Sequence, residues 1–385
     1  MEAIVRKCIK SGLISDEQPS LDVFDLDNFR GRCTSLLSAF PEPFFNHAMA
    51  VKANTIRGVM LEARGLGLGA ECASLQEAKH SLSLGFPAGQ VVFDSPCKTP
   101  SELREAVDLG LHITLDNEVE MAVVDEYIKT GVKEVPVIGL RINPVVGGGS
   151  IAMFNVATKV SKFGIPLVSE TREKILDMFR DHSWMTGVHI HVGSQGVGMD
   201  KFVDGITVLM NLVSDIEKER PGQITTVDIG GGLSTSYTEE VEPEAFNYNK
   251  YRKEIEKSAP SLLSGKYRVV TEMGRSLFLK SGTTLTRVEY VKEWIPGQNP
   301  IILTHVGTNQ FPREAYLPHQ WRHRFSLFNS QGEAKTGEEV MVDLAGPLCF
   351  QGDYLAKDVS LPRPVRGDLV AMHDTGAYTM SMYCK

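Results

Sequence analysis

The chain has 385 residues, of which 42% are apolar and 23% charged, so it has the composition of a globular protein with enough length for two domains. Its net charge of −8 disfavours nucleic acid or a membrane surface as a partner, because both require clustered positive charge. No apolar run of about 18 residues predicts a membrane span, and the six cysteines show neither metal-ligand nor disulfide spacing. We expect a cytoplasmic protein that binds a small molecule and no metal.

Eight short apolar segments recur between residues 45 and 272, and helix-like segments separate them. In one of these, 99–110, Thr99 and Glu102 form a capping-box pattern with Pro100 in the first turn. The apolar segments are FNHAMAVKA, LGLGAECA, QVVFD, LHITL, VPVIGLRI, TGVHIHVG, ITTVDIG and YRVVTE. Eight strand and helix repeats with nearly continuous apolar strands predict an α/β fold, a parallel (β/α)8 TIM barrel. A doubly wound sheet is the alternative.

After about residue 280 the pattern changes to strands in succession, at 283–294, 300–307, 338–346 and 368–374. Their alternating polar and apolar positions predict a C-terminal antiparallel β domain. We therefore expect a barrel over 26–280 and a β domain over 281–385, to which residues 1–25 add a strand. The glycine-rich stretch 143–162 has no clear period, which predicts a mobile loop over the barrel mouth.

Reactive side chains stand where the predicted strands end. In a TIM barrel these ends meet at one mouth, so the side chains are expected to converge. The groups are Lys52, Glu71, Arg141, His191 with Ser194, the triplet Gly230, Gly231 and Gly232, and Glu272 followed by Gly274 and Arg275.

Each of these features has an ordinary structural explanation when it is taken alone. Lys52 could reach solvent, the glycine triplet could form a turn, and Glu272 could belong to an ion pair at the barrel end. Together they suit a phosphorylated pyridine aldehyde, with an amine for the aldehyde, backbone NH groups for the phosphate and a carboxylate for the ring nitrogen.

Nine segments then occur in the order found in the fold-type III pyridoxal-phosphate decarboxylases, over about residues 20 to 383. They are HAMAVKAN, GAECASLQEA, LRINP, SKFGI, HIHVGSQ, DIGGGL, TEMGRS, GPLCFQGDYLAKD and DTGAYTMSM. The chain resembles the alanine-racemase-like fold family of diaminopimelate and ornithine decarboxylases. This resemblance implies an enzyme that uses pyridoxal 5′-phosphate to remove the α-carboxyl group of an amino acid.

By this similarity Lys52 forms a Schiff base with the cofactor, His191 stacks on the pyridine face and Glu272 pairs with the ring nitrogen. The residues implied in phosphate binding are Ser194, Gly230, Gly231, Gly232, Gly274, Arg275 and Tyr378. Cys349 resembles the proton donor to Cα. In the family its loop enters the neighbouring subunit's barrel, so Cys349 and Asp353 are expected to complete the partner's site in a homodimer.

The substrate end of the pattern departs from the family. Phe350 follows the cysteine where diaminopimelate decarboxylases carry Glu and ornithine decarboxylases Asp, and an apolar ring cannot replace the carboxylate that binds a distal ammonium group. The segment 305–325, with its LP and W-H pairs, is similar to the citryl-diaminopropionate decarboxylases of siderophore pathways. It carries Arg313, Arg322, His323 and Arg324, which either bind substrate carboxylates or form a solvated basic segment.

The departures predict that the substrate is neither diaminopimelate nor ornithine but a larger or carboxylate-bearing amino acid. Three alternatives are diaminopimelate decarboxylase proper, a catalytically inactive regulatory homologue, and a racemase on the same fold. The presence of Lys52, Glu272 and Cys349 opposes the inactive homologue, and the cysteine-bearing loop opposes the racemase.

Overall fold

The computed structural model describes residues 1–238, 247–317 and 321–383. Pro318, from the LP pair noted above, lies outside the described residues. The chain forms two compact units, which are treated separately here. The barrel unit consists of Arg30–Thr235 and Glu242–Leu277, and the β unit of Met1–Phe29, Ser236–Val241 and Phe278–Lys385, as far as these ranges are described. The domain boundaries expected from the sequence, 26–280 and 281–385, remain predictions.

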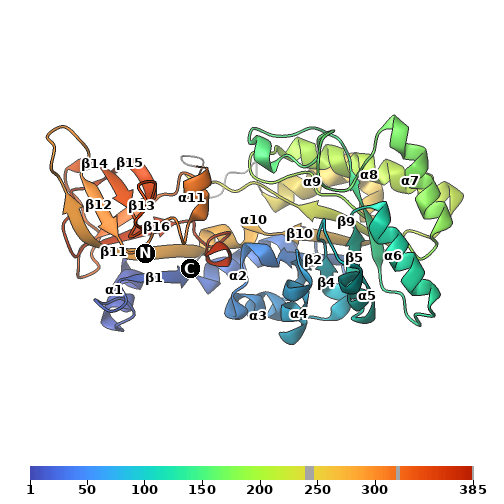
Figure 1. Ribbon diagram of the computed structural model, residues 1–385, viewed down its shortest axis with the longest axis horizontal. Helices are drawn as coiled ribbons and strands as arrows, with labels where there is room; N and C mark the ends of the chain where they lie inside the picture. The colour runs from blue at the N-terminus through green and yellow to red at the C-terminus, as the bar shows by residue number, and fades with distance from the viewer. Residues whose placement is uncertain (239–246, 318–320, 384–385) are drawn as a thin grey trace. The chain divides into compact units, whose positions relative to one another are not determined.

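The eight predicted apolar segments form the eight parallel strands of a closed barrel (Figure 1). Around the ring the strands are β2 (Phe45–Ala50), β3 (Gly69–Cys72), β4 (Val91–Phe93), β5 (His112–Leu115), β6 (Ile138–Asn143), β8 (Gly187–His189), β9 (Thr226–Gly231) and β10 (Arg268–Met273). Pairing of β5 with β6 and of β10 with β2 closes the ring. The predicted TIM barrel is confirmed, and the doubly wound alternative is wrong. A two-residue strand, β7 (Ile165–Pro166), pairs in parallel with the last two residues of β6.

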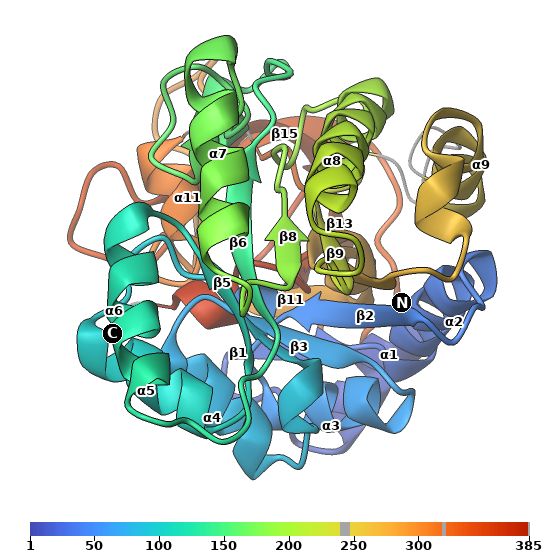
Figure 2. The same ribbon diagram turned by 90° about the vertical axis from the view of Figure 1, so that its right-hand side faces the viewer.

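Helices cover the outside of the barrel, as Figure 2 shows for α3 to α8. Their bounds are α2 (Leu26–Ala39), α3 (Arg57–Gly65), α4 (Leu75–Ser83), α5 (Pro100–Asp108), α6 (Glu118–Lys129), α7 (Ser169–Asp181), α8 (Met199–Glu219), α9 (Tyr248–Ser258) and α10 (Arg275–Phe278). The predicted capping box begins α5: the NH of Glu102 donates to Thr99 Oγ1 at 3.2 Å, and the NH of Thr99 donates to the Glu102 carboxylate at 2.8 Å.

Inside the barrel a cluster of apolar residues precedes a cluster of charged residues along the strands. Ala48, Val92 and Val270 pack together and are fully buried. Val92 and Val270 precede Asp94 and Glu272 by two residues, so each pair points to the same face of its strand. The apolar cluster therefore supports the charged residues at the carboxyl ends of the strands.

The β unit is a mixed sheet in the order β13, β16, β11, β12, β14 and β15, with β1 paired to β11. The strands are β1 (Ser20–Phe24), β11 (Gly282–Lys292), β12 (Ile301–Thr304), β13 (Phe325–Phe328), β14 (Glu339–Ala345), β15 (Tyr354–Pro362) and β16 (Leu369–His373), with helices α1 (Glu2–Lys10) and α11 (Pro312–Tyr316). The pairings are antiparallel as expected, except that β12 and β14 run parallel. No helix in the described part of the chain is both long and apolar enough to cross a membrane.

Candidate active site at the barrel mouth

An ion pair at the end of β2 brings together two of the predicted site residues. Lys52 lies in a single 3-10 turn directly after the strand, and its Nζ donates to Glu71 Oε1 over 2.6 Å. The lysine side chain is 39% exposed whereas the glutamate side chain is fully buried, so the amine is the accessible member of the pair. Burial raises the pKa of Glu71 to about 7, although Lys52 opposes this shift. The glutamate is therefore a weaker acid than an exposed carboxyl group.

Glu272, at the end of β10, presents a carboxylate that is only partly engaged. Its Oε2 lies 3.5 Å from His189 Nε2 and 4.0 Å from His191 Nδ1, and its side chain is 2% exposed. Its Oε1 is buried and has no hydrogen-bond partner among the residues that the structure describes. A buried carboxylate oxygen without a partner suits a ligand that brings its own NH group.

His191 stands directly after β8 as a neutral, partly buried ring. Burial, followed by the nearby Arg141 and Lys52 cations, holds the pKa of His191 well below its usual value. Its Nδ1 accepts from the NH of Gly231 at 3.4 Å, which leaves the flat face of the ring as its contact surface. An uncharged imidazole of this kind suits stacking on a pyridine ring.

The loops that follow β8 and β9 are bound to each other. Gln195 donates to the carbonyl of Thr235 at 2.6 Å and accepts from the NH of Thr235 at 3.1 Å. The NH of Gly196 donates to Ser234 Oγ at 3.2 Å. Ser194 lies in the first of these loops and is partly exposed. These contacts hold the two loops as one rim of the barrel mouth.

The glycine triplet at the end of β9 is required by close backbone approach. A Cβ on Gly231 would lie 1.7 Å from the carbonyl oxygen of Glu272, and one on Gly232 would lie 1.8 Å from that of Gly193. The NH of Gly230 donates to Asp228 Oδ1 at 2.8 Å, so this NH already has a partner within the strand. Gly274 and Arg275 are both buried and follow β10 directly.

The predicted mobile loop 143–162 is attached to this rim. The NH of Ser150 donates to the carbonyl of Gly196 at 3.0 Å, and Asn155 pairs with Gly193 in an isolated bridge. Asn155 also accepts from the NH of Gly149 at 2.6 Å. The loop therefore lies against the segment after His191; its predicted mobility stays a prediction.

The structure adds buried ionisable residues that the sequence did not single out, namely Asp94 directly after β4, His189 at the end of β8 and Asp228 within β9. Arg141 Nη1 donates to both oxygens of Asp94, at 3.2 and 3.1 Å. Burial raises the pKa of Asp228 well above its usual value, with Glu272 adding to the shift. A signal was available, because His189 and His191 are two residues apart on one strand and therefore share a face.

The remaining predicted site residues belong to the β unit. Tyr378 is partly exposed and has a positive φ of 57°. Arg313 is buried, with its guanidinium 4.4 Å from the ring centre of Trp321 and 5.9 Å from that of Tyr378. Its Nη2 donates to the carbonyl of Ala377 at 3.4 Å. Arg313 is therefore an enclosed cation and not part of a solvated segment.

The four basic residues of 305–325 do not form one exposed patch. Arg322 is exposed, but His323 is buried and its Nδ1 lies 2.7 Å from the carbonyl of His373. Arg324 donates to Asp374 at 3.2 Å. Neither alternative for this segment, a carboxylate-binding cluster or a solvated stretch, describes all four residues.

The cysteine loop between β14 and β15 presents Cys349 and Phe350 on the surface of its unit, where Phe350 is 59% exposed. Asp353, predicted to contact substrate, is instead buried and anchors this loop. Its Oδ1 accepts from the NH of Thr308 at 2.6 Å, and its Oδ2 accepts from the NH of Leu348 at 2.8 Å. The carboxylate is thus engaged in holding the loop in shape.

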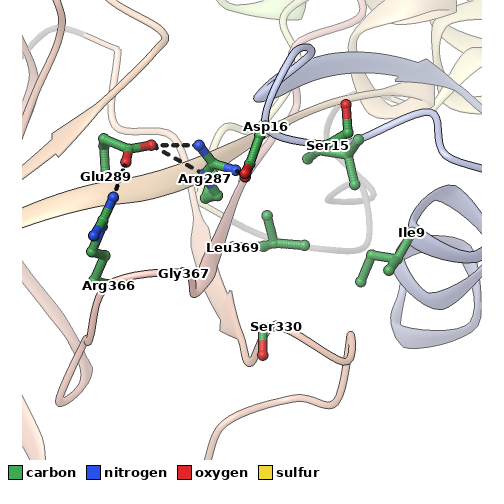
Figure 3. A pocket seen from close by; sticks show the side chains of 10 residues that line it. Ile9, Ser15, Asp16, Arg287, Glu289, Ser330, Arg366, Gly367 and Leu369 are labelled. Carbon is green, nitrogen blue, oxygen red and sulfur yellow. Dashed lines mark hydrogen bonds and ion pairs between the residues drawn. The ribbon is translucent and has the colours of Figure 1, made fainter.

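A separate cavity of about 500 Å³ in the β unit lies among Asp16, Arg287, Glu289 and Arg366 (Figure 3). Both arginines are directed at the carboxylate of Glu289, at 2.6 Å for Arg287 and 3.0 Å for Arg366. Arg287 also pairs with Asp16. Since these charges neutralise one another, the cavity offers no unpaired charge to a ligand.

The barrel mouth fits a cofactor with an aldehyde, a phosphate and a pyridine nitrogen. The accessible amine of Lys52, the buried Oε1 of Glu272, the neutral ring of His191 and the side-chain-free turn at Gly231 and Gly232 provide the complementary groups. Fold and site together fit the class of pyridoxal-phosphate enzymes built on a TIM barrel.

Comparison with known proteins also indicates a pyridoxal-phosphate enzyme. Residues 26–278 match the family model of the pyridoxal-dependent decarboxylases, pyridoxal binding domain. The diaminopimelate decarboxylase of Archaeoglobus fulgidus is 31% identical over 351 residues, which are 90% of this chain and 81% of that protein. The diaminopimelate decarboxylase of Pseudomonas aeruginosa is also 31% identical, over 86% of this chain and 76% of that protein. Among solved structures, diaminopimelate decarboxylase from Helicobacter pylori complexed with L-lysine has a TM-score of 0.85 at 22% identity, covering 97% of this chain and 90% of that one.

The chain belongs to the pyridoxal-dependent decarboxylase family. It is a carboxy-lyase that acts on an amino acid with pyridoxal phosphate as its cofactor, as the sequence predicted.

Proposed function

We propose that Lys52 is the residue that bonds the cofactor aldehyde, and that Glu272 pairs with the ring nitrogen while His191 covers one face of the ring. The observation that carries this assignment is the accessible amine of Lys52 in the same barrel mouth as the unpartnered Oε1 of Glu272. Ser194, Gly231, Gly232, Gly274, Arg275 and Tyr378 are assigned to the phosphate. The NH of Gly230 supports the turn through Asp228.

When bound, pyridoxal phosphate accepts the electron pair that the departing carboxylate leaves at Cα. The residues of the chain prepare the site for this step. Glu272 keeps a proton at the ring nitrogen because a buried carboxylate stabilises a nearby cationic NH. Glu71 takes or returns a proton at Lys52 Nζ, which its pKa of about 7 permits.

Cys349 is assigned to donate the proton that Cα then requires, as part of a homodimer with shared sites. Its loop is exposed at the tip and anchored by Asp353, so it has a fixed shape and a free surface with which to meet a second subunit. In this arrangement each active site combines Lys52 of one protomer with the partner's Cys349.

A complementation experiment tests the shared site. Cys349→Ala should lower kcat by about 10²-fold or more, since general acid catalysis contributes that much. An equal mixture of Cys349→Ala and Lys52→Ala subunits, refolded together, should regain roughly a quarter of wild-type activity, because half of the dimers contain one intact site of two. Mixing Lys52→Ala with the double variant is the control. If the subunits exchange but the mixture gains no activity, the active sites are not shared between subunits.

Two substrate classes are supported by different observations. The names of the relatives at 31% identity favour diaminopimelate itself. Phe350 supports the other class, an amino acid without a distal ammonium group, because a phenyl ring supplies no carboxylate with which an ammonium ion could form an ion pair. We propose the second class as the preferred substrate and diaminopimelate as the alternative.

Carbon dioxide release should be measured on diaminopimelate, ornithine, lysine, apolar amino acids and citryl-diaminopropionate with wild type, Phe350→Glu and Phe350→Gln. We expect Phe350→Glu to raise kcat/KM for diaminopimelate by about 10-fold or more, because a charged hydrogen bond to the ammonium is gained, while Phe350→Gln changes it little. If the wild-type enzyme turns over diaminopimelate rapidly and Phe350→Glu lowers that rate, the protein is a diaminopimelate decarboxylase proper. Bound cofactor without any release would favour the inactive homologue.

A further inference from the structure

His189 is a fully buried residue at the end of β8, between two carboxylates of the barrel interior. Its Nε2 lies 3.5 Å from Glu272 Oε2 and 3.8 Å from Asp94 Oδ2. Neither of its ring nitrogens has a hydrogen-bond partner within the described part of the chain. A buried histidine without partners requires an explanation, because unpaired polar groups in the interior are costly.

The surroundings of His189 hold one of these carboxylates still and leave the other able to adjust. Arg141 donates to both oxygens of Asp94, and its guanidinium packs 4.4 Å from the ring centre of Phe163. Asp94 is therefore fixed, and the Arg141 cation keeps its pKa below the usual range even against burial. Glu272 has no comparable clamp, since its nearest basic neighbours among the described residues are His189, at 3.5 Å, and the uncharged ring of His191, at 4.0 Å.

A proton on Nε2 explains this geometry. Nε2 lies within 3.8 Å of both Asp94 Oδ2 and Glu272 Oε2, so a proton on it offsets the repulsion that these carboxylates would otherwise exert on each other in a medium of low dielectric constant. A divalent cation bound by Asp94, His189 and Glu272 is the competing explanation, because their ligand atoms lie within 4.8 Å of one another. Arg141 disfavours it, since its guanidinium already occupies both oxygens of Asp94.

We propose that His189 is a positioning residue for the cofactor, whose Nε2 proton tethers Glu272 to the fixed Asp94 and so directs Oε1 of Glu272 at the ring nitrogen. This inference rests on the proposed pairing of Glu272 with the ring nitrogen and adds a residue that supports it. His189 does not touch the cofactor. Its effect is transmitted through the orientation of Glu272, in the way that outer residues orient the ligands of a metal.

The test compares two amides and one apolar side chain at position 189. Gln can place an NH near the position of Nε2, whereas Asn is too short to reach it and Leu has no donor. We expect His189→Leu and His189→Asn to weaken pyridoxal phosphate binding and lower kcat, each by about 10- to 100-fold, with KM for the amino acid little changed. His189→Gln should stay within about 3-fold of wild type for both. The dissociation constant of the cofactor and its absorbance spectrum are the readouts besides activity.

His112→Leu is the matched control, because His112 is also buried inside the barrel, on β5, and forms no ion pair with a described carboxylate. Should His189→Leu fail to fold, the contrast between Gln and Asn still decides. Three results would each overturn the inference. They are equal effects of His189→Gln and His189→Asn, an effect of His112→Leu as large as that of His189→Leu, and a divalent ion bound stoichiometrically to the purified protein. Glu272→Gln is measured beside them: unchanged cofactor binding and kcat in that variant would instead overturn the proposed role of Glu272.

Discussion

Replacing Lys52 by Ala should abolish decarboxylation, with a loss in kcat of about 10⁴-fold or more, because the variant has lost the amine that bonds the cofactor. Borohydride reduction of wild type should fix the cofactor on the peptide that contains Lys52, and the same treatment should leave the variant unlabelled. Carbon dioxide release and peptide mass analysis measure the two effects separately.

The fold should survive this substitution. Lys52 is the ion-pair partner of the buried Glu71, and it is also the cation that opposes the upward shift of the Glu71 pKa. Without Lys52 the pKa of Glu71 rises further above about 7, so the carboxyl becomes neutral and no unpaired buried charge is left at pH 7. Lys201→Ala, at a partly exposed lysine on α8 that pairs with Asp204, is the control. Retained labelling in Lys52→Ala would place the attachment elsewhere.

The barrel could be predicted from sequence because its strands are buried on both faces, which produces continuous apolar segments such as Val91–Phe93. The sheet of the β unit could be predicted only in outline. The parallel pairing of β12 with β14 depends on a contact across about forty residues of chain, and alternation within a strand indicates which face is buried but not which strand lies beside it. The helix at Glu2–Lys10 was not predicted, although Ile4, Val5, Cys8 and Ile9 recur at the three- and four-residue spacing of an amphipathic helix.

The candidate site could likewise be predicted only in part. Lys52, Glu272 and His191 stood out as reactive groups at strand ends, and their convergence followed from the barrel geometry. Asp353 was predicted as a substrate contact, but its position in the chain could not reveal that the NH groups of Thr308 and Leu348 occupy its oxygens. Arg313 likewise reads as an exposed cation in the sequence, and only the tertiary structure encloses it beside Trp321.

Glu272→Gln should lower kcat by about 10²- to 10³-fold while the cofactor remains bound, since the loss of one preorganised charge in a buried site has an effect of this size. The amide keeps the size of the side chain and can still form a hydrogen bond to the ring nitrogen, but it cannot stabilise a proton there. The electron pair left at Cα is then accepted less readily, so the chemical step slows and KM changes little. The spectrum of the bound cofactor should also change with the protonation of its ring.

Two comparisons make this prediction specific to the ring nitrogen. Glu105→Gln carries the same chemical change to an exposed glutamate that pairs with Lys79 on the barrel surface, and it should leave kcat and the spectrum unaltered. Glu272→Ala should weaken cofactor binding as well as kcat, because it removes the hydrogen bond together with the charge. A Glu272→Gln enzyme with wild-type kcat would mean that the buried carboxylate serves the barrel interior, where it faces His189, and not the cofactor.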